Sequence, residues 1–238
     1  MNTFTRTTLP FKARSVPSEA AVELWLMALQ QLPLESVPAG HDRADRLRGQ
    51  RIRQRFMLRL LLGSYLGCPG RDLELVRGER GKPMLGQRHA GSALSFNLSH
   101  SGEWLAVIVG QDCPVGVDIE QERNMPRAVA LARRYFPGKE ADSLSGLDEP
   151  FRSRTFLQHW TAREALVKAR GCGLAGTMDR IELDGSPPGI AGLPADWPQA
   201  NLWSLVMPPL PDGLVGHVAV GRPGVEVEVR VLEAGLVG

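Results

Sequence analysis

The residues between positions 115 and 120 constrain the fold more than any other stretch of the chain. Three β-branched residues alternate there with Gly116, Asp118 and Glu120. A period of two predicts a strand, and it places Asp118 and Glu120 on one face, about 6.6 Å apart along the strand. Neighbouring carboxylates repel unless a cation lies between them, and Mg²⁺ prefers oxygen ligands. The stretch therefore predicts either a metal-binding strand or an acidic strand face exposed to water.

The composition is that of an ordinary globular protein, with 238 residues, 43% of them hydrophobic and 23% charged. This length allows one large domain or two small ones. No apolar run approaches the roughly 18 residues of a membrane helix, and the first fourteen residues lack a signal-peptide layout. Three widely spaced cysteines argue against a disulfide framework or a zinc site, and a net charge of +2 is too small to indicate nucleic-acid binding. We therefore expect a cytoplasmic protein with neither a membrane nor a nucleic acid as partner.

A basic helix is predicted over residues 41–63. The pattern recurs at intervals of three to five residues, at Leu47, Ile52, Phe56, Leu60 and Gly63. Positions 41 to 59 hold seven arginines against two aspartates. Such a face attracts phosphates or an acidic partner, or it is simply solvated.

Strands are expected on both sides of this helix. Residues 22–29 fit either a helix or a strand, and their aromatic and β-branched content favours the strand. Residues 93–99 and 104–109 are typical of a hairpin. The four residues from Ser99 to Gly102 would form its turn, which puts His100 in a loop, where a functional histidine and a merely exposed one are both open.

The second half of the chain begins after a junction at residues 111–114. Short helices are predicted over 128–136 and 139–147, and a longer one over 151–170, closed by Gly171 and Gly173. Thr161 and Glu164 also match a capping box, which would start a helix there instead. The apolar residues before Thr161 favour the longer helix.

Glu164 and Lys168 share one face of that helix, either as an ordinary surface pair or as part of a site. The chain after it is rich in short apolar alternations that predict strands, at residues 202–206, 215–220 and 225–232.

Four short motifs follow one another in a distinctive order between residues 46 and 173. After the basic helix come Gly-Lys-Pro at 81–83, Asn-Leu-Ser-His-Ser at 97–101, Gly-Val-Asp-Ile-Glu at 116–120 and Trp-Thr-Ala-Arg-Glu-Ala-Leu-Val-Lys at 160–168. In this order and spacing the chain resembles the Sfp-type 4'-phosphopantetheinyl transferases, which activate carrier proteins of fatty-acid, polyketide and nonribosomal peptide synthesis.

The resemblance implies an α+β fold made of a pseudo-twofold pair of similar subdomains, here residues 1–113 and 114–238. Coenzyme A and Mg²⁺ would bind at their interface. It also implies a monomer that transfers the 4'-phosphopantetheine arm of coenzyme A to a serine of an apo acyl or peptidyl carrier protein, releasing 3',5'-ADP.

The matched motifs assign roles to individual residues. Asp118, Glu120 and Glu164 would hold the metal, and Glu164 would complete the metal site or act as the base. Lys168 would assist the leaving group, and His100 would serve both catalysis and binding. The coenzyme-binding residues implied by the resemblance are Arg55, Lys82, Pro83, Asn97, Ser99, His100 and Lys168, with Arg48 and Arg51 as alternatives to Arg55.

One residue departs from the family pattern. Arg163 stands where the family commonly has lysine, so a planar fork replaces a point charge. Two other classes of function stay open: a module that binds coenzyme A or a nucleotide without transferring anything, and a structural α+β protein with an acidic strand. The binding module would need the cationic residues but not the three carboxylates.

Overall fold

A computed structural model describes residues 4–30, 43–78, 81–173 and 176–233. The helices of this part are α1 (Arg43–Leu66), α2 (Ala128–Tyr135), α3 (Gly138–Ser145) and α4 (Phe151–Arg170). The strands are β1 (Thr5–Thr7), β2 (Ala21–Ala28), β3 (Leu75–Arg77), β4 (Pro83–Leu85), β5 (Leu94–Ser101), β6 (Trp104–Gln111), β7 (Val115–Gln121), β8 (Glu182–Asp184), β9 (Gly189–Gly192), β10 (Ser204–Val206), β11 (Leu214–Val220) and β12 (Glu226–Leu232).

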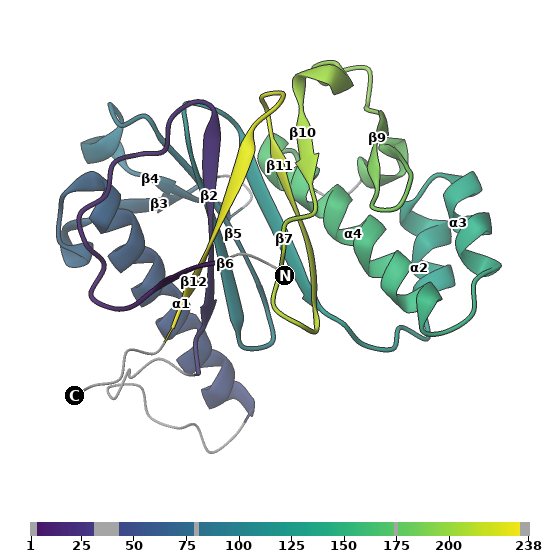
Figure 1. Ribbon diagram of the computed structural model, residues 1–238, viewed down its shortest axis with the longest axis horizontal. Helices are drawn as coiled ribbons and strands as arrows, with labels where there is room; N and C mark the ends of the chain where they lie inside the picture. The colour runs from purple at the N-terminus through teal and green to yellow at the C-terminus, as the bar shows by residue number, and fades with distance from the viewer. Residues whose placement is uncertain (1–3, 31–42, 79–80, 174–175, 234–238) are drawn as a thin grey trace.

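The first unit is a five-stranded sheet covered on one face by α1 (Figure 1). The strand order is β1-β12-β2-β6-β5, with β12 parallel to both neighbours and the other pairs antiparallel. Met57, Leu61 and Tyr65 of α1 recur every four residues and pack against Trp25 and Val107 of the sheet. The predicted strand over 22–29 is confirmed as β2.

The predicted basic helix is confirmed, but its buried face is not the one that its apolar pattern suggested. Leu47, Ile52 and Phe56 are each close to half exposed, whereas Met57 and Leu61 are fully buried. On a helix of 3.6 residues per turn, Ile52 and Phe56 point away from the side of Met57 and Leu61. Leu47 lies on that side but ahead of the buried stretch, which starts at Gln54. The predicted start at His41 lies outside the described residues.

The second unit is the three-stranded antiparallel sheet β10-β11-β7, crossed by α4 (Figure 1). The longer helix over 151–170 and the two short helices before it are confirmed. The alternative start at Thr161 is wrong, because Thr161 is fully buried inside α4 and its hydroxyl donates to the carbonyl of Leu157 at 2.9 Å. Gly116 brings β7 against α4, since a Cβ there would lie 2.1 Å from the carbonyl oxygen of Ala165.

Side chains of β5 join the two sheets where β5 lies beside β7. The backbone N–H groups of Val117, Ile119 and Gln121 donate in turn to Asn97, Ser99 and Ser101 at 3.0–3.3 Å. These contacts satisfy buried N–H groups that have no strand partner on this side. The Asn-x-Ser-x-Ser spacing is therefore explained first by structure, because alternate residues of β5 point toward β7.

The hairpin of β5 and β6 is confirmed, but its predicted four-residue turn is wrong. Ser101 pairs with Trp104, so only Gly102 and Glu103 form the turn. Gly102 takes a left-handed φ of 55°, the conformation that a two-residue turn needs at its first position. His100 therefore belongs to β5, opposite Leu105, and not to a loop.

The α+β class is confirmed, and the order of elements repeats along the chain. The series β2, α1, β3–β4, β5, β6 is followed by β7, α4, β8–β9, β10, β11, with α2 and α3 inserted before α4. A pair of similar subdomains would produce such a repetition, and the division after residue 113 stays a prediction. Strand β12 returns to the first sheet beside β2, so the last segment does not stay with the second unit.

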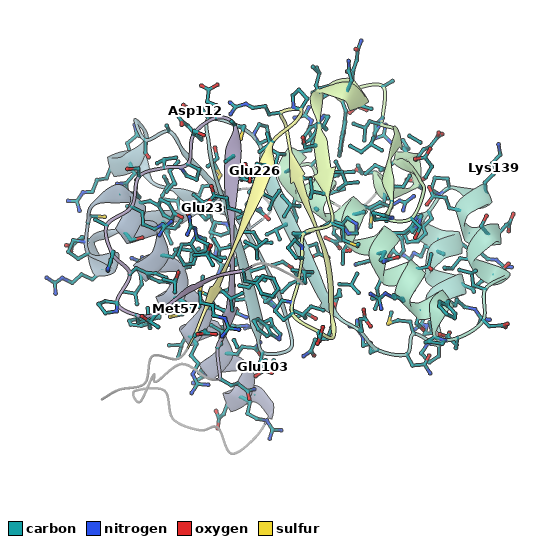
Figure 2. All side chains as sticks on the ribbon, in the orientation of Figure 1. Glu23, Met57, Glu103, Asp112, Lys139 and Glu226 are labelled. Carbon is teal, nitrogen blue, oxygen red and sulfur yellow. The ribbon has the colours of Figure 1, made fainter. Side chains whose placement is uncertain are left out.

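A buried charge cluster around Glu23, which is labelled in Figure 2, holds this return in place. Glu23 of β2 accepts ion pairs from Arg14 at 2.6 Å and from Arg230 of β12 at 2.7 Å, and a hydrogen bond from Tyr65 of α1. Burial alone would raise the pKa of Glu23, but these partners lower it overall.

Two features bear on the expected compartment. All three cysteines are free. No helix in the described ranges combines the length and the apolar character needed to cross a bilayer.

Candidate active site

Strand β7 presents Asp118 and Glu120 on one face, as the period-two pattern predicted. In the structure this face is turned toward α4. Asp118 is 6% exposed and accepts hydrogen bonds from Ser99 Oγ and Lys168 Nζ, both at 2.7 Å. Glu120 is more open and accepts from Ser101 Oγ at 2.8 Å and from Arg123 at 2.9 Å. Burial raises the pKa of Asp118, although Lys168 opposes the shift.

Helix α4 places Glu164 and Lys168 one turn apart above these carboxylates. Glu164 is 9% exposed. Burial first, and then the negative charge of Asp118, raise the pKa of Glu164 to about 7, and Glu120 adds to the shift. The three carboxylates therefore act on one another across a shared space.

Lys82 enters the same space from the β3–β4 hairpin of the first unit. Its Nζ donates to the backbone oxygen of Lys168 at 3.0 Å. Burial and the charge of Lys168 lower the pKa of Lys82. Among the described residues Lys82 forms no ion pair with a carboxylate, so an anionic ligand would relieve the repulsion between two neighbouring cations.

A cavity of about 330 Å³ lies between the hairpin and α4. Residues from both units line it: Gly81, Lys82, Pro83, Asn97, Leu98, Glu164, Val167, Lys168, Gly171 and Gly173. A second groove of about 330 Å³ shares Lys82 and Pro83 and continues past Phe96 to Val115. Five predicted site residues from three separate segments thus line one hollow: Lys82, Pro83, Asn97, Glu164 and Lys168.

The structure does not bring His100 into this hollow. Alternation along β5 turns His100 away from Ser99 and toward the side that α1 covers, where it is exposed. Gln50 of α1 donates to the carbonyl of Gly102 at 2.5 Å, so the N-terminal third of α1 lies next to this turn. The expected Ser99–His100 pair therefore has its two side chains on opposite faces of the strand.

The predicted helix arginines also lie on the α1 side. Arg48, Arg51 and Arg55 are exposed, and neither of the two hollows includes them. Arg53, three residues after Gln50, lies on the helix side that meets the β5–β6 turn, and its Nε is buried without a partner. The spacing of three residues between Gln50 and Arg53, which puts both on one side of the helix, could be read from the sequence.

Comparisons with known proteins identify the family of this chain. A model described as 4'-phosphopantetheinyl transferase superfamily matches residues 114–195, and one described as 4'-phosphopantetheinyl transferase, N-terminal, matches residues 16–112. The 4'-phosphopantetheinyl transferase HetI of Nostoc sp. is 36% identical over 215 residues, which cover 85% of this chain and 89% of that protein. The chain belongs to the 4'-phosphopantetheinyl transferase family. Its activity is therefore that of the family, transfer of phosphopantetheine from coenzyme A to a carrier protein.

Other relatives of the transferase match less of the chain. The L-aminoadipate-semialdehyde dehydrogenase-phosphopantetheinyl transferase of Rattus norvegicus is 29% identical over 172 residues, 68% of this chain and 56% of that protein. The 4'-phosphopantetheinyl transferase AcpT of Salmonella typhi is 38% identical over 98 residues, 41% of this chain and 50% of that protein. Family membership favours the enzyme over the binding module and the structural protein.

The metal site needs a separate test against the geometry of the transferase. Oxygen donors at Asp118, Glu120 and Glu164 have the chemistry that Mg²⁺ prefers, and their mutual repulsion would fall on binding a cation. Within the described ranges, however, no three acidic, histidine or cysteine side chains are gathered closely enough to hold an ion. Instead, Asp118 forms an ion pair with Lys168. The donor set fits Mg²⁺, which needs only one or two carboxylates when phosphates and water supply the rest.

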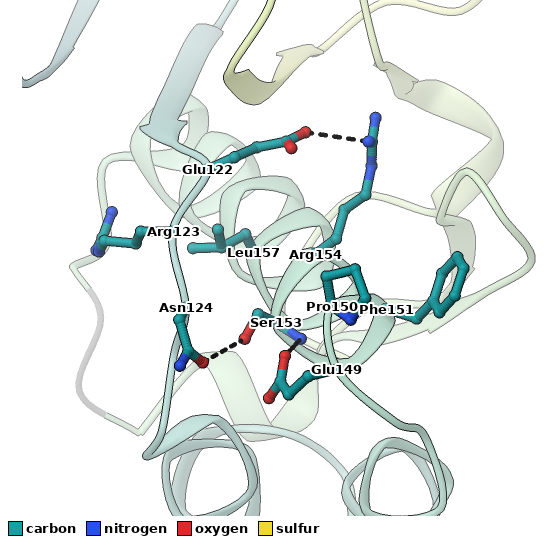
Figure 3. Close-up of a pocket in the computed structure, with 9 residues that line it drawn as sticks. All are labelled: Glu122, Arg123, Asn124, Glu149, Pro150, Phe151, Ser153, Arg154 and Leu157. Carbon is teal, nitrogen blue, oxygen red and sulfur yellow. Dashed lines mark hydrogen bonds and ion pairs between the residues drawn. The ribbon is translucent and has the colours of Figure 1, made fainter.

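Sequence reasoning missed a further cavity, of about 460 Å³, at the end of β7 (Figure 3). Arg123 lines it and also pairs with Glu120, so the cavity adjoins the acidic strand. Phe151 on its rim is 68% exposed, and Arg154 pairs with Glu122 at 3.3 Å across it. The sequence feature that could have pointed to this cavity is Arg123, a basic residue three positions after Glu120.

Proposed function

We propose that the transferase binds coenzyme A between the β3–β4 hairpin and α4 and transfers its phosphopantetheine at Glu164. The observation that carries this proposal is the raised pKa of Glu164, which lines one hollow with Lys82 and Lys168 and feels the charges of Asp118 and Glu120. A buried carboxyl that titrates near neutral pH is suited to accept a proton. Coenzyme A is the substrate whose diphosphate matches the two lysines.

The phosphates would be held by cations from both units. Lys82 and Lys168 lie next to each other and would share the diphosphate, with the Ser99 hydroxyl beside them. We assign the 3'-phosphate to the α1 side, where His100 and the helix arginines provide positive charge. Which arginine binds it is open to a mutational scan of Arg48, Arg51, Arg53 and Arg55.

The metal carboxylates would be Asp118, Glu120 and Glu164. A bound Mg²⁺ would neutralise charge on the diphosphate as the leaving group departs. Lys168 would have to exchange its contact with Asp118 for one with phosphate, which its 28% exposed side chain allows.

The transfer itself needs no nucleophile from the enzyme. The serine oxygen of the carrier forms a bond to the β-phosphorus, and the bond from that phosphorus to the oxygen of 3',5'-ADP breaks. Glu164 accepts the serine proton, and Lys168 stabilises the departing phosphate.

The carrier protein would approach over the cavity of Figure 3. That cavity adjoins Glu120 through Arg123, and it offers the exposed ring of Phe151 together with two arginines. Because Glu122 and Glu149 also line the cavity and balance the two arginines, the part of a carrier that matches it is an apolar contact residue on Phe151. The exposed arginines of α1 provide a positive surface for an acidic carrier.

One chain supplies every residue of the proposed site, which supports a monomer, and three free cysteines support a reducing cytoplasm. The test is to incubate the protein with coenzyme A, Mg²⁺ and several apo carrier proteins, and to follow intact mass. We expect one phosphopantetheine arm on at least one carrier, lost with the E164Q variant. Transfer at the normal rate by E164Q would refute the role of Glu164.

A further inference from the structure

Arg163 is completely buried, although it is charged and lies next to Glu164 in sequence. Its side chain is 0% exposed and stacks on the ring of Phe136 at 4.2 Å. It points away from the coenzyme cavity, whose lining does not include it. Its guanidinium donates to four acceptors: Glu140 Oε1 at 2.5 Å and the backbone oxygens of Ile181, Met178 and His159 at 3.0–3.2 Å.

Glu140 of α3 completes this buried node. Its Oε1 also accepts from the N–H of Leu183 at 3.0 Å, and its Oε2 contacts His159 Nδ1 at 2.8 Å. Burial alone would raise the pKa of Glu140, but His159 and Arg163 lower it overall. One ion pair therefore ties α4 to α3 and to the start of β8.

The node also contacts the chain that follows α4. After α4 the chain passes Gly171 and Gly173, which line the cavity, and returns at the 3₁₀ turn η3 (Met178–Arg180). Arg163 binds carbonyls at that return, on Met178 and Ile181. The same side chain thus holds both the helix that carries Glu164 and the chain at η3.

We propose that Arg163 is a positioning residue, which sets the rotation of α4 so that Glu164 and Lys168 face the coenzyme. This inference rests on the proposed roles of those two residues. A lysine offers three donors from a single atom, whereas the four acceptors here are spread around a planar group. A lysine therefore cannot reproduce the node.

The test separates positioning from stability. R163K should lower Tm, weaken coenzyme A binding measured by calorimetry, and reduce kcat/KM by about 10–100-fold, because small misplacements of reacting groups are costly. In R163M/E140Q both charges are removed, so no unpaired buried charge is left and Tm should recover toward the wild-type value. Coenzyme A binding and transfer should stay low in this double variant.

Two results would overturn the inference: wild-type coenzyme A binding and kcat/KM in R163K, or recovery of Tm and transfer together in R163M/E140Q. The matched control is R170K, an exposed arginine of the same helix, which should change neither Tm nor binding. E164Q separates this inference from the proposed function. If E164Q transfers normally, the proposed function fails, while the coenzyme A affinity of R163K still decides the role of Arg163.

Discussion

Gly116 sets how closely β7 approaches α4, and replacing it with alanine tests that contact directly. The added Cβ would lie 2.1 Å from the carbonyl oxygen of Ala165 and 2.5 Å from the backbone nitrogen of Ala169. Both are backbone atoms, so no side-chain rotation removes the clash. To reach 3.4 Å, where ordinary contact begins, α4 must move by about 1.3 Å, the difference between 3.4 and 2.1 Å.

That movement has two measurable consequences. Overpacking of this kind costs about 1–3 kcal/mol, which corresponds to a fall in Tm of roughly 2–12 °C for a chain of this length. It also separates Lys168 Nζ from Asp118 Oδ1, now 2.7 Å apart. A displacement of about 1 Å can cost on the order of 100-fold in rate, so we expect kcat/KM of G116A to fall by about that factor.

The assay combines thermal unfolding with intact-mass transfer kinetics. G138A is the matched control, because a Cβ at Gly138 meets nothing within 4 Å, and it should behave as wild type. If G116A keeps both its Tm and its kcat/KM, close approach of α4 does not position the site and the reasoning is refuted.

Three further predictions concern the charged groups. E164Q should fold normally and lose several orders of magnitude in kcat, measured by transfer to an apo carrier; wild-type kcat would remove Glu164 from catalysis. K82A should raise KM for coenzyme A with a smaller effect on kcat, and an unchanged KM would contradict its placement at the diphosphate. The raised pKa of Glu164, about 7 against an ordinary 4.5, means that the folded protein keeps a proton that the unfolded chain releases. In EDTA the free energy of unfolding should therefore fall as pH rises from about 4.5 to about 7, by on the order of 1–3 kcal/mol, and E164Q should flatten this slope.

The parts of the site that follow from local periodicity could be predicted from the sequence. Alternation along β7 placed Asp118 and Glu120 on one face, and the i, i+4 spacing placed Glu164 and Lys168 together on α4. Both patterns depend only on the geometry of a single element.

Features that depend on contacts between distant segments could not be predicted in this way. His100 belongs to β5 because the turn has only two residues. Gly102 allows such a turn, but its presence does not by itself predict the length of the turn. Leu47 is exposed although it is apolar, because the partner surface of α1 begins further along the helix. Arg163 shows only a departure from a pattern, while its partner Glu140 lies 23 residues away on another helix.

The central claim is that Asp118, Glu120 and Glu164 share one divalent cation beside coenzyme A. Calorimetric titration of Mg²⁺ into the protein–coenzyme A complex tests it most directly, with E226Q as a control for loss of an exposed carboxylate on β12 (Figure 2). We predict one Mg²⁺ site per chain, unchanged in E226Q and weakened at least about tenfold in D118N, E120Q and E164Q, since each loses a charged oxygen ligand. Mg²⁺ affinity in E164Q equal to that of the wild type would contradict the claim.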